Sequence, residues 1–175
     1  PKIVRRLFRQ IVLGVQYMHS CGYAHLDLSL ENVLISLPRG ATDLSDAEVK
    51  IIDFGMALKH ANVDSKKLRW RGKPYSMAPE LYHGTGIDAK AADLYSLGVI
   101  LFAIATGGPA YLEVDDKAFK YVWMGRQGIE KLLDMWQKSV DPDALDLICK
   151  LMCRVEDRYT MFNLLQHRYL RTPDD

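Results

Sequence analysis

The sequence predicts a mainly α-helical domain with a few short β-strands. Apolar residues recur at three- and four-residue steps over residues 2 to 20, which is the spacing of one helix stripe. A long run without charges follows at residues 94 to 112, and the β-like runs are short. The chain has 175 residues, 49% of them hydrophobic and 26% charged, so it can bury one core and is not of a disordered or collagen-like class.

The first expected elements are an amphipathic helix and three short strands. The helix covers residues 2 to 20, and Cys21-Gly22 supplies its stop. The strands are expected at Tyr23-Ala24, at Val33 to Ile35 and at Val49 to Ile52. Runs of this length suit small strands rather than a large sheet.

A stretch without periodicity, residues 53 to 80, separates these strands from the remaining helices. It holds no strong helix or strand pattern, and a loop this long is usually functional or disordered. Further helices are expected at 90 to 105, around 116 to 124, at 128 to 137, at 142 to 153, and from the cap Thr160 to about residue 167. Asp141 can cap the helix at 142, where Pro142 suits the first turn.

The uncharged run from Leu94 to Leu112 is the one candidate membrane span. Thr106-Gly107-Gly108-Pro109 breaks it after Ala105, and the remainder is too short to cross a bilayer. A helix that is apolar on nearly every side is instead expected at the centre of a folded core. We therefore expect no membrane span.

Charge and cysteine content restrict the partners and the compartment. A net charge of +1 gives no overall field that attracts nucleic acid or anionic lipid, so no nucleic-acid partner is expected. The three cysteines, Cys21, Cys149 and Cys153, form an odd set without long-spaced pairs, which favours a reducing, intracellular and cytoplasmic location. Cys149 and Cys153 share a helix face but make only half a zinc site, so we interpret them as small buried apolar residues.

Three motifs carry the chemistry. The segment His25 to Asn32 places a carboxylate, Asp27, and an amide, Asn32, five positions apart. Asp53-Phe54-Gly55 follows a predicted strand, and Ala78-Pro79-Glu80 closes the long loop. In these motifs the chain resembles the protein kinases, whose catalytic loop reads H-R-D-x-x-x-x-N, whose metal motif is D-F-G and whose activation segment ends in A-P-E.

The resemblance extends over nearly the whole chain. The segment Asp93 to Gly98 is similar to the D-x-W-S-x-G start of the family's central helix, with Tyr95 in place of Trp. The resemblance implies that Arg158 pairs with Glu80 and that Asp93 braces the catalytic-loop backbone. It further implies that residues 1–175 are the C-terminal lobe of a kinase domain, with a catalytic loop at 25–32, an activation segment at 53–80 and a helical subdomain at 90–170.

The family also implies roles for the polar residues. Asp27 orients the substrate hydroxyl, while Asn32 and Asp53 present hard oxygens to the Mg²⁺ that accompanies ATP. His25 supports the catalytic loop. The packing of the Phe54 ring, beside the flexible Gly55, determines whether the metal ligand Asp53 points into the site or away from it.

Each of these residues also has a plainer interpretation. Singly, Asp27 and Asn32 would be turn formers and Asp53 a strand-end cap. Their joint order and spacing favour the catalytic interpretation.

Three positions depart from the family pattern. Leu26 stands where most members have the Arg that grips an activation-loop phosphate, so control by that route is not expected. Ser29 stands where serine/threonine kinases usually have a Lys near the γ-phosphate, which removes one cation. Lys73 replaces the usual Thr, and its long stem could return an ammonium to the site.

The ATP-covering parts of the family have no counterpart in this sequence. No G-x-G-x-x-G loop, V-A-I-K lysine or matching glutamate occurs, so we expect this N-terminal lobe to lie upstream of Pro1 in a longer chain. The isolated fragment is expected to bind ATP poorly and to transfer little phosphate.

Three function classes follow from the motifs. Ser29-Leu30-Glu31-Asn32 lacks the tyrosine-kinase patterns, which favours a protein kinase acting on Ser or Thr of a protein substrate. A pseudokinase that only binds partners is the alternative, and retention of Asp27, Asn32 and Asp53 counts against it. A small-molecule kinase shares part of the motif but generally lacks A-P-E.

Overall fold

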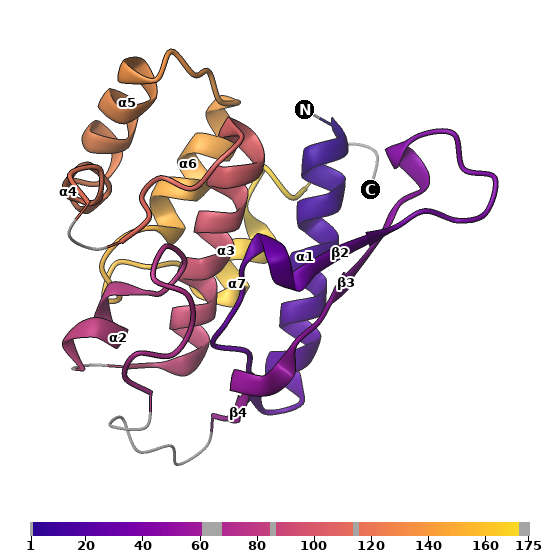
Figure 1. Cartoon of the computed structure of the whole chain (residues 1–175), viewed down its shortest axis with the longest axis horizontal. Coiled ribbons are helices and arrows are strands. Elements are labelled where there is room, and N and C mark those ends of the chain that lie inside the picture. Colours follow the sequence, from indigo (N-terminus) through magenta and orange to yellow (C-terminus); the bar gives the residue numbers. More distant parts are fainter. Residues whose placement is uncertain (1, 61–67, 85–86, 114–115, 172–175) are drawn as a thin grey trace.

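The computed structural model describes residues 2–60, 68–84, 87–113 and 116–171, and these residues form a helical body with short strands (Figure 1). The predicted mainly α-helical architecture is confirmed. In chain order the elements are α1 (Lys2–Ser20), β1 (Tyr23–Ala24), β2 (Val33–Ser36), β3 (Glu48–Ile51), β4 (Leu58–Lys59), α2 (Pro79–His83), α3 (Ala89–Thr106), α4 (Phe119–Trp123), α5 (Arg126–Met135), α6 (Pro142–Leu151) and α7 (Met161–Gln166).

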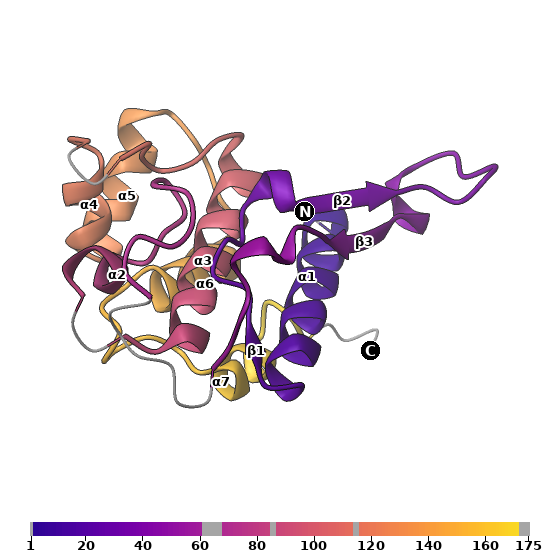
Figure 2. The same ribbon diagram turned by 60° about the horizontal axis from the view of Figure 1, so that its bottom comes forward.

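Helix α3 forms the centre of the body, with α6 packed closely against it and α1 on another side (Figure 2). The Asp88 side chain accepts hydrogen bonds from the first turn, and Gly107 ends the helix in the left-handed region with φ 92°. At Gly98 an added Cβ would lie 2.7 Å from the Cβ of Leu151, closer than real contacts allow. Glycine therefore sets how closely α3 approaches α6.

The length argument against a membrane span at α3 was wrong, whereas the expected burial of this helix in the core is confirmed. Helix α3 runs over 18 residues, so among the described residues it alone is long and apolar enough to cross a bilayer. However, 78% of that window is buried inside the protein. Burial against neighbouring helices, rather than insufficient length, accounts for its apolar composition.

Helix α1 holds the strands through its buried stripe and one polar side chain. Leu7, Phe8, Ile11, Val12 and Val15 are buried on the face that the apolar periodicity predicts. Gln10 donates to Ala47 O at 3.0 Å and accepts from Val49 N at 3.0 Å, which attaches the start of β3 to the helix. The sequence predicts the apolar stripe but not this polar attachment.

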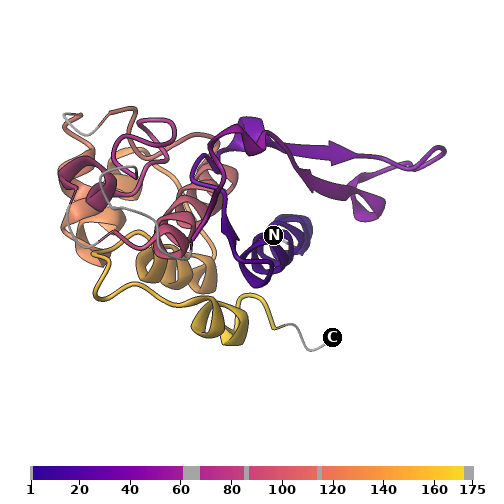
Figure 3. The same cartoon turned by 90° about the horizontal axis from the view of Figure 1, so that it is seen from below.

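The four strands form two separate two-stranded antiparallel pairs. β2 pairs with β3, with Val33 opposite Ile51, and this hairpin projects from the body beside α1 (Figure 3). β1 pairs with β4, with Ala24 opposite Leu58. The segment after β1 and the segment after β3 are thereby brought to the same end of the strands.

Several predicted boundaries shift in the structure. The strand predicted to end at Ile52 ends at Ile51, and the helix predicted at 128–137 is α5, from Arg126 to Met135. The helix predicted at 116–124 is confined to α4, because Asp116 caps a preceding turn through Ala118 N. β4 and α2 lie in the stretch predicted to lack elements, of which residues 61–67 lie outside the described part.

The ends of α6 and α7 follow local capping rules. Asp141 accepts hydrogen bonds from two first-turn N–H groups, and Thr160 forms a reciprocal capping box with Asn163. Helix α6 ends at Leu151, two residues earlier than predicted. Cys149 and Cys153 are free and half-buried rather than fully buried, and burial raises the pKa of the Cys149 thiol to about 11.

Candidate active site

A buried carboxylate on α3 holds the loop that follows β1. The two oxygens of Asp93 accept hydrogen bonds from His25 N and Leu26 N, each at 2.8 Å. His19 Nε2 lies 2.8 Å from the same carboxylate, so Asp93, which is fully buried, has three partners. Leu26 adopts φ 63°, a backbone region that costs a non-glycine residue energy. These hydrogen bonds offset that cost and fix the turn.

His25 connects this loop to the segment after β3. Its Nε2 lies 3.0 Å from Ile52 O, which places the proton on Nε2, and its Nδ1 accepts from Asp27 N at 3.3 Å. The ring also packs against Phe54, with centroids 5.3 Å apart. Both nitrogens are thus used in contacts with the backbone, and the role of His25 in the geometry is to join two loops.

Asp27 has one oriented oxygen and one unpartnered oxygen. Asn32 Nδ2 donates to Asp27 O at 2.7 Å and to Asp27 Oδ2 at 3.1 Å. Lys73 Nζ lies 3.5 Å from the same Oδ2. Oδ1 is buried and has no hydrogen-bond partner among the described residues. A buried acceptor without a donor is costly.

Asp53 lies at the left-handed turn after β3. Its φ is 60°, and its Oδ1 accepts from Gly55 N at 3.2 Å. Ile52 N donates to Asn32 O at 3.0 Å, which brings the backbone next to Asp53 alongside Asn32. The side chain of Asp53 is exposed, so its second oxygen faces solvent rather than the core.

The side chains of Asn32 and Asp53 carry the oxygen ligands that Mg²⁺ prefers. Because the amide nitrogen of Asn32 points to Asp27, its oxygen is left for a cation, and Asp53 adds a carboxylate. No cluster of three His, Cys, Asp or Glu side chains that could hold a metal occurs in the described part of the chain. A cation here would therefore depend on a bound phosphate and water for further ligands, as Mg²⁺ usually does in proteins.

The end of the long loop is anchored to the helical body. Arg158 donates from Nη1 to Glu80 Oε1 at 2.6 Å and from Nη2 to Glu80 Oε2 at 3.0 Å. The guanidinium also lies 5.0 Å from the ring centre of Tyr95. Ser96 on α3 donates to Ser76 O at 2.8 Å. The segment from residue 76 to Glu80 is thus held at two points.

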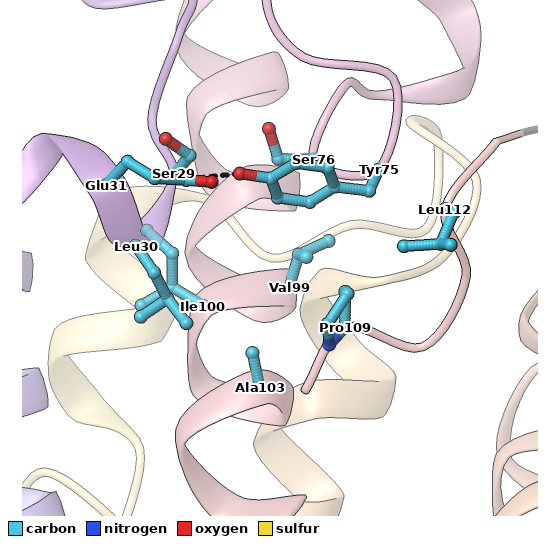
Figure 4. A pocket seen from close by; sticks show the side chains of 10 residues that line it. All are labelled: Ser29, Leu30, Glu31, Tyr75, Ser76, Val99, Ile100, Ala103, Pro109 and Leu112. Carbon is cyan, nitrogen blue, oxygen red and sulfur yellow. Dashed lines mark hydrogen bonds between the residues drawn. The ribbon is translucent and has the colours of Figure 1, made fainter. Parts of the chain in front are cut away.

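Two side chains of the same segment reach the loop after β1. Lys73 Nζ donates to Ser29 Oγ at 2.8 Å. The Tyr75 hydroxyl donates to the Glu31 carboxylate, beside an apolar pocket of about 240 Å³ that reaches Val99 and Pro109 (Figure 4). This bond lowers the pKa of Glu31, whereas burial and the same bond raise the pKa of Tyr75 well above its usual value.

The geometry thus brings the first two predicted motifs together, anchors Ala78-Pro79-Glu80 to the helical body, and adds residues that sequence reasoning missed. His19 and Glu31 carry no motif signal, because their partners lie 74 and 44 positions away. Tyr75 likewise has no motif signal for its contact with Glu31.

Comparisons with known proteins identify the family of this chain. Residues 1–170 match the family model described as the protein kinase domain. The chain is 33% identical over 174 residues to serine/threonine-protein kinase kin-29 of Caenorhabditis elegans. The alignment covers 99% of this chain and 19% of that protein. It is 35% identical over 172 residues to maternal embryonic leucine zipper kinase of Xenopus laevis, and the alignment covers 95% of this chain and 24% of that protein. Serine/threonine-protein kinase PLK4 of Nematostella vectensis is 33% identical over 173 residues, and the alignment covers 95% of this chain and 16% of that protein.

The chain belongs to the protein kinase family. These relatives are named as serine/threonine kinases or, for the Xenopus protein, simply as a kinase. The chain spans no more than about a quarter of the length of these relatives.

Proposed function

We propose that this chain is the C-terminal lobe of an ATP-dependent protein kinase that phosphorylates Ser or Thr of protein substrates. The catalytic loop is 25–32, the activation segment 53–80 and the helical subdomain 90–170. The observation that supports this most directly is Asp27, whose Oδ2 is oriented by Asn32 while its buried Oδ1 has no described partner. The relatives' serine/threonine specificity supports the substrate class.

In the proposed reaction the carboxylate of Asp27 receives the hydrogen bond of the substrate hydroxyl. The hydroxyl oxygen forms a bond to the γ-phosphorus, the bond to the bridging oxygen breaks, and ADP leaves with that electron pair. The hydroxyl proton passes to Asp27. Mg²⁺, when bound, offsets the charge of the phosphates, and Asn32 and Asp53 are the residues that would hold it.

A lobe that covers ATP is part of this proposal. An apolar hollow of about 570 Å³ lies against α1 and β3, and Tyr17 and Phe54 at its edge are 72% and 55% exposed. We place the docking of the N-terminal lobe of the full-length protein over this hollow. Without that cover, the isolated chain transfers little phosphate.

The alternative is a binding module without catalysis. The contact between Lys73 and Asp27 supports it, because an ion pair with an ammonium is also the arrangement of a purely structural carboxylate. Substitution of Asp27 distinguishes a catalytic kinase from a binding module, because only phosphoryl transfer requires its carboxylate.

The test is Asp27→Asn in the full-length protein, with Asp134→Asn on the exposed face of α5 as the matched control. A positioned acid or base contributes about 10²–10⁴-fold, so kcat for a serine peptide is expected to fall by that factor. The Kd of ATP stays within a few-fold, and the control retains wild-type kcat.

Two results would contradict the proposal. Loss of ATP binding in Asp27→Asn means that Asp27 holds the metal or the fold instead of the hydroxyl. Absence of transfer by the wild-type protein with any peptide or divalent metal favours the binding module.

A further inference from the structure

Gly72 brings the activation segment unusually close to the catalytic loop. Its φ is 98°, and an added Cβ would lie 2.8 Å from Leu26 O and 3.7 Å from Asp27 Oδ1. Only glycine tolerates both the backbone region and the missing space. Lys73 therefore directly follows the point where the activation segment comes closest to the catalytic loop.

The Lys73 ammonium is held at the catalytic loop. It donates to Ser29 Oγ at 2.8 Å, and Ser29 is only 1% exposed. Asp27 Oδ2 lies farther away, at 3.5 Å, and the Lys73 side chain is 31% exposed. An ammonium has three donors and two are directed at these oxygens, so the third remains for a ligand on the open side.

We propose that Lys73 is a catalytic residue that contacts the γ-phosphate during transfer. This inference rests on the proposed kinase function. Transfer spreads negative charge over three equatorial oxygens, and a fixed cation beside Asp27 stabilises that charge. Because Ser29 stands where the family usually has a Lys, the catalytic loop lacks one cation. Lys73 supplies a cation to this place from the activation segment.

The arrangement couples this cation to the fold of the activation segment. Ser76 is bound by Ser96, and Glu80 is bound by Arg158, so the segment that carries Lys73 is fixed from its far side. Release of the segment would remove the cation while Asp27 and Asn32 stayed in place. The ammonium is therefore present at the site only when the segment is docked.

The experiment is steady-state kinetics of the full-length protein with Mg²⁺, ATP and a serine peptide. Lys73→Met removes the charge, and Lys131→Met, an exposed position on α5, is the matched control. Lys73→Thr and the double variant Ser29→Lys with Lys73→Thr test whether the cation can be supplied from the other segment. Thermal unfolding of every variant checks that the domain still folds.

The expected result is a fall in kcat of about 10²-fold for Lys73→Met and Lys73→Thr, the typical loss of one transition-state donor. The KM of the peptide changes by less than a few-fold, and Lys131→Met behaves as wild type. The double variant Ser29→Lys with Lys73→Thr is expected to have a kcat at least tenfold higher than that of Lys73→Thr alone. This rescue distinguishes charge at the phosphate from a merely structural ion pair with Asp27.

Three outcomes overturn the inference. If wild type transfers phosphate and Lys73→Met keeps more than a third of its kcat, Lys73 is not the cation, while the kinase function stands. If wild type transfers no phosphate under any condition, the proposed function and this inference fail together. A Lys73→Thr variant that folds, is slow and is not improved by Ser29→Lys also overturns it.

Discussion

Removing the carboxylate of Glu80 is expected to destabilise the protein strongly. The Arg158 side chain is 1% exposed and that of Glu80 7%, and two short hydrogen bonds join them. In Glu80→Ala the guanidinium keeps, among the described residues, two carbonyl oxygens, Ala91 O and Cys153 O, and the face of Tyr95. Breaking a buried pair by removing one partner costs about 3–5 kcal/mol.

That loss is large compared with the total free energy of unfolding, about 5–15 kcal/mol for a domain. Urea denaturation of wild type and variant measures it from the shift in midpoint at constant slope. Glu130→Ala is the matched control, because its pair with Arg126 is about half exposed and such pairs contribute about 0–1 kcal/mol. The double variant Glu80→Met with Arg158→Met removes both charges and is expected to cost less than Glu80→Ala alone.

The reasoning is refuted if Glu80→Ala lowers the free energy of unfolding by less than about 1 kcal/mol, the upper range for an exposed pair. It is also refuted if the double methionine variant is as unstable as Glu80→Ala. In that case lost packing, and not an uncompensated charge, explains the effect.

Two further predictions concern the metal ligand and acid stability. Asp53→Asn in the full-length protein is expected to abolish Mg²⁺-dependent transfer while leaving the midpoint of unfolding nearly unchanged, because an amide is a poorer ligand for a hard cation; wild-type turnover would disprove the assignment. The hydrogen bond from His167, with a further one from Arg126, lowers the pKa of Asp146. Its stabilisation is therefore present above the ordinary aspartate pKa of about 3.9 and is lost as pH falls through the lower folded pKa. Unfolding curves of wild type and Asp146→Asn should converge in strong acid, and a gap that is constant with pH contradicts this linkage.

The sequence by itself determined the helical class, the main helix caps and the family. Apolar periodicity, the cap residues Asp141 and Thr160 and the order of short motifs act within a few residues, so their signals are readable along the chain. The same reasoning identified Asp27, Asn32 and Asp53 as one candidate site. It missed β4, because a two-residue strand exists only through its pairing with β1.

Only the tertiary structure decided which distant groups meet. His19 reaches Asp93 from 74 positions away, and Tyr75 reaches Glu31 across 44. Such contacts depend on how α3 and the activation segment pack against the loop, and no local preference encodes that distance. The burial of α3 was expected from the sequence, but packing alone decided which helices cover it, with α6 closely against it and α1 on another side.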